Sequence, residues 1–466
     1  MSHDLIAVGG GFAGLVAANR AADLGRRVVV LEAATEAKHQ CASRLCGGVF
    51  HVAYRSVMAP PAELAANVAS CSGGFVRPEL AAALADNAAR AVRWLQATGA
   101  EFAGMTPDQG WKDWILAPLG FHDHTCVVWQ GYGADRLMDR LEARLVAAGG
   151  QLLRGCRARE LIVTDGGCSG VLVDGPTGTV RVDAAAVVLA DGGFHGNPEM
   201  LRRHVTRHPE HLKLRGPGAG RGDGIAMAQA AGAAVTGMDT FYGHLLSADA
   251  LAKDNLSPFP FIDFLASAGL LVDAEGRRFA DEGGGGIYMA NQLARHGDGL
   301  AVAIFDEAIW QSAGREFFCP PNPNLVDAGG TLHRADDLAS LARAAGRPQA
   351  AVAVSVAAYN AAVDAGATDR LAPPRTTRKY PAMPVRTGPF YAAPTCAAIT
   401  HTMGGVVVDA HARVLRPDGA AIDGLYAAGS SCGGLEGGVP VGYIGGLIKA
   451  VVFGLLAAET SAGGGR

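Results

Sequence analysis

Three glycines near the start of the chain have the spacing of a nucleotide-binding turn. Gly9, Gly11 and Gly14 fit a G-x-G-x-x-G pattern, and Glu32 follows Gly11 by 21 residues. In this pattern the glycines let the backbone approach a pyrophosphate, and the following helix N-terminus supplies oriented N–H groups. A carboxylate at the end of the next strand accepts hydrogen bonds from a ribose. These residues predict a dinucleotide site, against the alternative of a tight turn and a solvated charge.

The elements that position this turn are predicted on either side of it. Leu5 to Val8 is an apolar strand, Gly14 to Leu24 has helical spacing of alanine and leucine, and Arg27 to Leu31 is a β-branched strand. Together they form one βαβ unit. An acidic ribose partner suits FAD or NAD and disfavours a nucleotide with a 2′-phosphate. The turn alone leaves the choice between these two cofactors open.

Length and composition exclude several classes of protein. The 466 residues, 49% hydrophobic and 18% charged, suit an enzyme of two large domains and exclude a disordered or collagen-like chain. The net charge of -4, without a long Lys/Arg run, makes nucleic acid an unexpected partner. Nine scattered cysteines with no CxxC pair favour a reducing compartment and argue against an iron–sulfur or zinc site.

The chain shows neither a secretory signal nor a predicted membrane span. A strand is predicted at the very start, where a signal peptide would need a charged and then an apolar region. The most apolar stretch, Ile444 to Ala458, contains Lys449 and is shorter than the ~20 residues that a bilayer requires. We expect a buried helix there, no transmembrane segment, and a cytoplasmic protein.

The remaining pattern predicts an α/β fold in which a Rossmann-type domain is split in sequence. After residue 234 the chain becomes richer in aromatic residues, prolines and polar turns, and glycine-rich apolar character resumes after residue 379. We therefore expect the first domain in residues 1–234 and 380–466, and an inserted α+β capping domain in residues 235–379. The elements predicted around this insertion are helices at Pro78 to Thr98 and Ala134 to Ala148, strands at Arg157 to Thr164, Gly170 to Asp174, Val180 to Val182 and Ala185 to Leu189, and a hairpin of Gly405 to Val408 with Arg413 to Leu415.

Several motifs together resemble one flavoprotein family. They are GGGFAGLVAA, VVLADGGFHGNPEML, GRGDGIAMAQAAGA, GRRFADE, HTMGGVVVD and GLYAAGSSCGG. The chain resembles, over nearly its whole length, the flavoprotein-subunit family of fumarate reductase and succinate dehydrogenase. That family also contains 3-ketosteroid Δ1-dehydrogenases and tricarballylate dehydrogenases, to whose patterns this sequence is most similar. The resemblance implies FAD rather than NAD.

The resemblance also implies which residues contact FAD. The segment from Ser43 to Gly48 would run near the isoalloxazine ring, and Cys156 to Ala158 would flank the adenine. The implied contacts are Gly9, Gly11, Phe12, Ala13, Gly14, Glu32, Ala33, Ser43, Gly47, Gly48, Arg157, Ala158, Asp191, Gly192, Gly193, Gly429, Ser430, Gly446, Leu447 and Ile448.

Two features bear on how FAD is held. Ser430 stands where the family often has glutamate. His51 is not at the position of the histidine that carries covalent flavin in succinate dehydrogenases, and Cys46 is a possible attachment point. We expect non-covalent FAD.

Hydride exchange beside a carbonyl or carboxylate needs a proton donor or acceptor and an electropositive clamp for the developing enolate. His401 matches the family histidine that binds a substrate oxygen, and otherwise it is a core histidine. Tyr443 precedes a helix start, so its hydroxyl and nearby N–H groups can polarise a substrate oxygen, as in ketosteroid dehydrogenases; otherwise it only packs. Arg44 and Arg295 are candidate carboxylate partners or solvated arginines.

The sequence departs from fumarate reductases in two places. Those enzymes carry an arginine in the last glycine-rich loop and another after the glutamate of the RFxNE motif. Here Pro440 and Tyr443 stand in the first region, and Gly283 to Gly286 in the second. A true fumarate reductase is therefore not expected.

We expect an FAD-dependent dehydrogenase that introduces a C=C bond next to a carbonyl or carboxylate of a small organic acid or cyclic ketone. The alternatives are an ene-reductase running the reverse direction and a flavin electron-transfer subunit without a substrate of its own. The expected partners are a small-molecule substrate and an electron acceptor, which can be a quinone, an electron-transfer protein or dioxygen. No metal site is expected, because His204, His208 and His211 and the pair His122 and His124 around Asp123 match no recognised ligand motif.

Overall fold

The glycine turn joins the first strand to the first helix of a Rossmann-type unit. In the computed structural model, which describes residues 2–104, 112–120, 129–253, 259–316, 320–377 and 380–464, β1 is His3–Val8, α1 is Phe12–Asp23 and β2 is Val28–Glu32. β1 pairs in parallel with β2, and the intervening helix is buried along most of its length. The predicted βαβ unit is therefore confirmed.

The main sheet runs in the order β17-β18-β8-β1-β2-β5. Its further strands are β5 (Gln151–Arg154), β8 (Gly178–Leu189), β17 (Arg413–Leu415) and β18 (Ala421–Ala427). All neighbours are parallel except β17 and β18. β18 follows the capping region in sequence yet pairs with β8, so the C-terminal part of the chain completes the first domain's sheet.

Two strands predicted separately are one long strand, β8. Its first half pairs antiparallel with β7 (Gly167–Gly175), which in turn pairs with β6 (Arg157–Thr164), and its second half pairs in parallel with β1. The first half is largely exposed and the second half is buried. This change of burial within one strand produced the apparent break in the sequence pattern.

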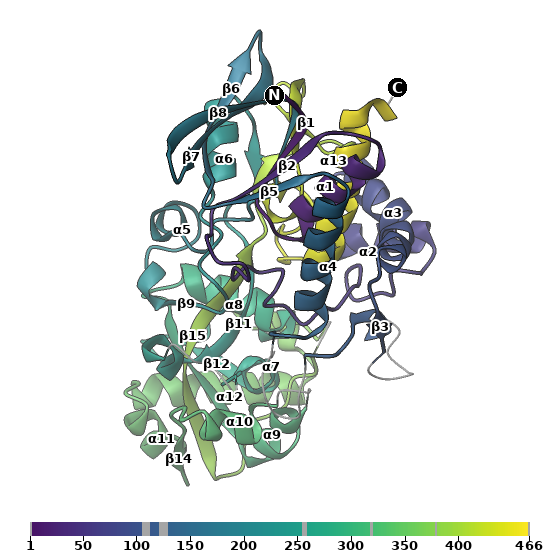
Figure 1. Cartoon of the computed structure of the whole chain (residues 1–466). Coiled ribbons are helices and arrows are strands. Elements are labelled where there is room, and N and C mark those ends of the chain that lie inside the picture. The colour runs from purple at the N-terminus through teal and green to yellow at the C-terminus, as the bar shows by residue number, and fades with distance from the viewer. Residues whose placement is uncertain are drawn as a thin grey trace.

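Helices cover the sheet. They are α2 (Pro61–Cys71), α3 (Pro78–Ala97), α4 (Gly133–Ala147), α5 (Pro198–His204), α6 (Asp223–Ala230) and α13 (Gly446–Glu459), and two short strands, β3 (Phe102–Ala103) and β4 (Ile115–Leu116), form a separate hairpin. Figure 1 shows α13 beside α1 at the sheet, near the C-terminus. The predicted helices at 78–98 and 134–148 agree with α3 and α4 to within one residue at each end.

The run Gly446–Gly463 is the one stretch with the length and hydropathy of a membrane span in the described part of the chain. α13, which makes up most of it, packs against α1 and α3. Its lysine, Lys449, is fully buried and pairs with the fully buried Glu436. The helix is thus a core element, as the sequence predicted.

The second layer of the molecule is a six-stranded sheet built around β15 (Phe390–Thr402). Its other strands are β9 (Leu212–Leu214), β11 (Phe241–Ser247), β12 (Leu270–Val272), β13 (Leu300–Asp306) and β14 (His333–Ala335). The helices around it are α7 (Asp263–Ala268), α8 (Gly286–Arg295), α9 (Glu307–Gln311), α10 (Pro321–Asp327), α11 (Leu338–Ala344) and α12 (Gln349–Asp364). Figure 1 shows this cap below the parallel sheet, with β15 running lengthwise through it.

Strand pairing in the cap crosses both ends of the predicted insertion. β9 lies before residue 235 and β15 lies after residue 379, yet both belong to the cap sheet. Composition missed them because β9 is only three residues long and β15 is as apolar as the strands of the first domain.

The prediction that residues 405–408 and 413–415 pair with each other as a hairpin is wrong. β16 (Gly405–Val407) pairs with β10 (Val235–Thr236) and β19 (Cys432–Gly433), while β17 pairs with β18. A single bridge between Val408 and Val414 remains of the predicted pairing.

Candidate active site

A cavity of about 980 Å³ lies between the parallel sheet and the cap. On one side its wall is formed by the loops after β1, β2 and β8 and by the start of α13. On the other side the wall is formed by β11, the segment around α7 and the glycine run before α8. Ligands of open parallel sheets bind outside the carboxyl ends of the strands, which is where this cavity is found.

The glycine turn packs tightly against neighbouring backbone, which a side chain at Gly9 or Gly14 would prevent. Gly9 has a φ of +104°, and a Cβ there would lie 2.6 Å from the oxygen of Ala190. A Cβ on Gly14 would overlap the oxygen of Gly9. Gly11 caps α1 without a side-chain hydrogen bond of its own, the Phe12 N–H donates a 3.0 Å hydrogen bond to the Ser43 hydroxyl, and Gly11, Phe12 and Ala13 line the cavity.

Glu32 is fixed at the opposite edge of this turn. Its carboxylate accepts hydrogen bonds of 2.8 Å from the backbone N–H groups of Gly10 and Ala34. The buried ring of His39 lies 3.5 Å from the same carboxylate, and neither of its nitrogens has a hydrogen-bond partner in the described part of the chain. The sequence analysis missed His39. The sequence feature that could have pointed to His39 is its position seven residues after Glu32, on the segment that leads toward the cofactor.

Most residues implied to contact FAD line this one cavity. They are Gly9, Gly11, Phe12, Ala13, Glu32, Ala33, Ser43, Gly47, Gly48, Arg157, Ala158, Asp191, Gly192, Gly429, Ser430, Gly446 and Leu447. Gly14, Gly193 and Ile448 lie behind the wall: Gly14 against Gly9, Gly193 against Thr402, and Ile448 in the core. Residues far apart in sequence thus converge on one site, and their contacts with FAD stay a prediction.

Asp191 is the most perturbed carboxylate on this wall. It accepts hydrogen bonds from the N–H of Gly224, at 2.7 Å, and from the hydroxyl of Ser431, at 3.2 Å. Burial nevertheless raises the pKa of Asp191 to about 6. Arg157, on the same wall, is paired with Asp223 by two hydrogen bonds of 2.8 and 2.9 Å.

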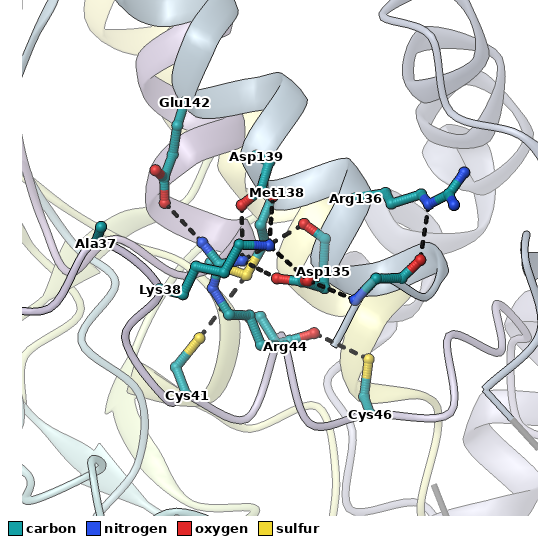
Figure 2. A network of polar contacts seen from close by, with 12 residues as sticks. Ala37, Lys38, Cys41, Arg44, Cys46, Asp135, Arg136, Met138, Asp139 and Glu142 are labelled. Atoms are coloured by element: carbon teal, nitrogen blue, oxygen red, sulfur yellow. Dashed lines mark hydrogen bonds and ion pairs between the residues drawn. The ribbon is translucent and has the colours of Figure 1, made fainter. Parts of the chain in front are cut away.

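Arg44 does not join the other two predicted catalytic residues. It is fully buried, does not line the cavity, and pairs with Asp135, Asp139 and Glu142 of α4. Figure 2 shows Arg44 and Lys38 pointing toward these carboxylates. The expectation of a substrate carboxylate partner therefore does not hold, because three protein carboxylates already occupy the guanidinium. Arg44 instead ties the segment that includes Ser43, Gly47 and Gly48 to α4.

Arg295, the second arginine considered from the sequence, also lies outside the cavity lining. Its guanidinium is 3.3 Å from the carboxylate of Asp239 and is partly exposed. His208 pairs with Glu210, and His211 bonds the backbone oxygen of Asp298. No group of three side chains suited to a metal ion occurs in the part of the chain that the structure describes, and His122, Asp123 and His124 lie outside it.

His401 and Tyr443 do come together, at the end of the cavity where α13 begins. A Cβ on Gly446 would lie 3.5 Å from His401 Nε2 and 3.8 Å from the Tyr443 hydroxyl, so the three residues surround one point. The Tyr443 oxygen accepts a 3.0 Å hydrogen bond from the Gly446 N–H, which leaves the phenolic proton available to a ligand. His401 Nε2 is buried and has no hydrogen-bond partner among the residues that the structure describes.

The charge state of this pair is neutral. Burial, assisted by the positive charge of Lys449, lowers the pKa of His401 well below its ordinary value. Burial likewise raises the pKa of Tyr443 well above its ordinary value. Both groups are therefore neutral hydrogen-bond donors near pH 7, directed at the same space.

A third set of polar groups adjoins them and was missed from the sequence. Tyr242 is directly opposite His401 in the β11–β15 pairing, and its ring stacks on Tyr443 with centroids 4.0 Å apart. The Tyr242 hydroxyl lies 3.2 Å from His244 Nε2, and His244 Nδ1 pairs with the carboxylate of Asp263. All three line the cavity.

The signal for this set was weak. Tyr242 and His244 are two residues apart, so they share one face of a strand. Asp263 lies 19 residues further along the chain, and only the fold brings it to His244. Its other oxygen accepts from the Leu245 N–H at 2.6 Å, which fixes the carboxylate.

The site combines three features: a dinucleotide-binding turn at the carboxyl end of a parallel sheet, a cap over it, and a pair of neutral hydrogen-bonding groups beneath the cap. Together they are typical of a two-domain flavoprotein oxidoreductase. The chain belongs to the FAD binding domain family, whose model matches residues 4–444. The Gly9–Gly14 turn, the N-terminus of α1 at the cavity wall and the fixed carboxylate of Glu32 fit the pyrophosphate and ribose of FAD.

Curated relatives and solved structures agree with this assignment. The chain is 27% identical to the vinyl phenol reductase of Lactiplantibacillus plantarum, over 94% of this chain and 91% of that protein. It is 32% identical to the NADH:acrylate oxidoreductase of Vibrio harveyi, but it spans only 32% of that protein's length. The fold is similar to the 3-ketosteroid Δ1-dehydrogenase of Sterolibacterium denitrificans, with a TM-score of 0.73, 19% identity, and coverage of 99% of this chain and 100% of that one. These matches confirm the α/β fold and the flavoprotein family predicted from the motifs.

Removing Arg44 should destabilise the protein strongly. Arg44→Ala removes the guanidinium shared by Asp135, Asp139 and Glu142, and breaking a buried pair in this way costs up to about 3–5 kcal/mol, with Lys38 remaining as a partner of Asp135. The exposed pair of Arg140 and Glu101 provides a matched control, because Arg140→Ala should cost about 0–1 kcal/mol. Urea unfolding of both variants measures the difference, and equal stability of the two would contradict the assigned role.

The raised pKa of Asp191 predicts a pH dependence of the FAD-free protein. In the folded state the Asp191 carboxyl keeps its proton up to about pH 6, and in the unfolded state it loses the proton near pH 4. The free energy of unfolding that Asp191 contributes therefore falls as the pH rises between these values. Asp191→Asn removes that slope. The melting temperature of the variant minus that of the parent should therefore increase from pH 4 to pH 6.5, and a constant difference would refute the argument.

Proposed function

We propose that this protein, an FAD-dependent oxidoreductase acting on CH–CH bonds, introduces a C=C bond beside a carbonyl or carboxylate of a small organic acid or cyclic ketone. The observation that carries this proposal is the convergence of His401, Tyr443 and Gly446 on one point of the FAD-family cavity. When bound, FAD supplies the hydride acceptor. The chain's own residues must hold the substrate oxygen and take a proton.

His401 and Tyr443 suit the holding of a substrate oxygen. Removal of a proton beside a carbonyl places negative charge on the oxygen, and preorganised donors in a dry site stabilise it. Both residues are buried, both are neutral, and each has a proton to donate. Donors of this kind stabilise the negative charge that develops on the oxygen in the transition state more than they stabilise the bound substrate. Such a difference raises the reaction rate and not only the affinity.

Tyr242 suits the proton transfer. Its hydroxyl donates to His244 Nε2, and burial lowers the pKa of His244, so this ring is a neutral acceptor. In the proposed step Tyr242 takes the proton from the substrate carbon as its own proton passes to His244. The resulting imidazolium is stabilised by Asp263, in the way an aspartate supports the histidine of a hydrolase triad.

The reverse reaction is the second candidate. Vinyl phenol reductase and the fumarate reductase (cytochrome) of Shewanella frigidimarina, which is 27% identical over 98% of this chain, are reductases by name. The same groups would then run in reverse, with Tyr242 donating its proton to carbon. A third candidate, a flavin electron-transfer subunit without a substrate, is disfavoured by the cavity beyond the nucleotide turn.

Anaerobic titration of the FAD-loaded protein separates these candidates. Bleaching of the oxidised flavin by saturated acids or cyclic ketones supports the dehydrogenase, and reoxidation of dithionite-reduced flavin by acrylate, fumarate or 4-vinylphenol supports the reductase. No response in either direction supports the electron-transfer subunit. Rapid reoxidation of the reduced flavin by air would then indicate dioxygen as the electron acceptor, and rapid reoxidation by a soluble quinone would indicate a quinone. If neither reoxidises the flavin rapidly, an electron-transfer protein is indicated.

We also propose that FAD is held without a covalent bond. Burial raises the pKa of the Cys46 thiol to about 12, and its Sγ donates a 3.0 Å hydrogen bond to the Ser43 oxygen, so it is a poor nucleophile. Acid precipitation of the purified protein should release FAD into the supernatant, identified by chromatography. Yellow colour that remains with the precipitate would indicate a covalent link.

Loss of either donor should slow flavin reduction far more than it weakens FAD binding. Removing one such donor typically costs about 100-fold to 1000-fold in rate, or about 3–4 kcal/mol. His401→Ala and Tyr443→Phe should therefore retain FAD and be reduced slowly in stopped-flow experiments with an active substrate. Tyr443→Phe keeps the ring that stacks on Tyr242, so a parental rate in this variant would assign Tyr443 to packing alone.

Tyr242→Phe should abolish the proton transfer while keeping the stack. We expect a rate loss of about 100-fold or more, within the range for general acid–base groups. The His244→Ala variant should reduce the flavin slowly, and its reduction rate should lose the pH dependence of the parent, because Tyr242 could no longer pass its proton to His244. Rates measured from pH 5 to 10 for the parent and both variants test this, and a Tyr242→Phe variant as fast as the parent would exclude it as the acid–base group.

A further inference from the structure

The cap side of the cavity is lined by aromatic rings. Four of them belong to β11 and to the segment running from β11 into α7, one precedes β15, and one lies in the loop that follows the nucleotide-binding strands. They are Tyr54, Tyr242, Phe259, Phe261, Phe264 and Tyr380.

These rings touch one another in two runs that meet at Tyr443. Tyr242 stacks on Tyr443, and the adjoining His244 ring makes an edge contact with Phe261, whose centroid is 5.4 Å from that of Phe259. On the other side Tyr54 lies edge-on to Tyr443 at 6.3 Å. Phe264 and Tyr380 form a separate edge contact at 5.8 Å. The predicted donors therefore sit inside an aromatic chamber.

One wall of the chamber has no side chains. Gly284, Gly285 and Gly286 line the cavity, and a Cβ on Gly285 would lie 2.5 Å from the Tyr380 ring. A Cβ on Gly286 would overlap the Asp263 carboxylate. The glycine backbone therefore packs directly against the Tyr380 ring and the Asp263 carboxylate, and the missing side chains allow both groups to lie at the cavity wall.

Charges of both signs adjoin the chamber, so together they do not single out a second carboxylate on the ligand. Asp263 contributes a carboxylate to the wall, and the His401 and His244 rings carry no charge near pH 7, because burial lowers the pKa of each. Arg215 stands over the rings of Phe259 and Phe261 at 4.7 and 5.2 Å and donates to Thr400, next to His401. A ligand with one oxygen-bearing end and one apolar end matches this distribution.

We propose that the substrate carries an aryl group beside the reacting carbons, with the oxygen at His401 and Tyr443 and the ring in the aromatic chamber. This inference rests on the proposed function and narrows its substrate class. A short aliphatic dicarboxylate would leave the rings uncovered, and its second charge would meet both Asp263 and Arg215, whose charges act in opposite directions. The rings therefore act as the specificity-determining surface of the cap.

Ligand binding to the oxidised, FAD-loaded protein tests the proposal without requiring turnover. Three saturated acids are compared by titrating the flavin difference spectrum: 3-phenylpropionate, propionate and succinate. We expect 3-phenylpropionate to bind at least about tenfold more tightly than propionate, which corresponds to about 1.4 kcal/mol. Succinate should bind no more tightly than propionate.

Two variants test whether the chamber makes this difference. Phe264→Leu and Tyr380→Leu should each reduce the preference for 3-phenylpropionate, while Phe279→Leu should keep it. Phe279 stacks on His296 in the cap and lies outside the cavity, so it is a matched control. Flavin content and melting temperature of each variant verify folding, and having two variants keeps the test valid if one fails.

Succinate binding as tightly as 3-phenylpropionate, or a preference that survives both chamber variants, would overturn the inference. Failure of the proposed function looks different. In that case the aryl acid is still bound preferentially, but no ring-bearing or aliphatic compound exchanges electrons with the flavin in either direction.

Discussion

The pairing of β11 with β15 is the interaction on which the candidate site depends. β15 is hydrogen-bonded to four other strands of the cap, and its last residues reach the cavity where α13 begins. The register places Tyr242 opposite His401, and a register irregularity follows at Gly243. A shift of β11 by one residue would turn Tyr242 to the other face of the sheet, away from His401. The strand pairing thus sets which groups meet Tyr443, a residue that belongs to the other domain.

Two buried charge clusters hold the flavin side of the site against this strand. Arg44 joins the segment after β2 to α4, and Lys449 joins α13 to the loop that contains Glu436. Buried pairs contribute little net stability relative to apolar residues of the same size. Their geometric demand is strict, however, since each charge needs its partner at hydrogen-bond distance. We interpret them as fixing the loops that carry Ser43 and Tyr443, both at the cavity wall.

The electrostatics of the cavity change from one end to the other. At the nucleotide end, the α1 N-terminus and its glycine turn offer N–H groups to an anion, with Glu32 placed for hydroxyl groups. At the cap end, His401 and Tyr443 are neutral groups among aromatic rings with pKa values shifted by burial, and Asp263 and Arg215 add one charge of each sign. Low polarity strengthens each hydrogen bond made to a developing charge. The two ends therefore suit a charged cofactor that stays bound and a weakly charged substrate that reacts.

The sequence by itself determined the nucleotide turn, the family and the α/β class, because these depend on spacings within short segments such as Gly9 to Glu32. It also identified His401 and Tyr443, which lie in motifs of the family. It did not determine that Arg44 is occupied by carboxylates 91 to 98 residues away, nor that Tyr242, His244 and Asp263 form one set. It also divided β8 in two and placed β9 and β15 outside the cap. Each of these depends on strand register and on packing between distant segments, which single-segment patterns do not contain, so only the tertiary structure decided them.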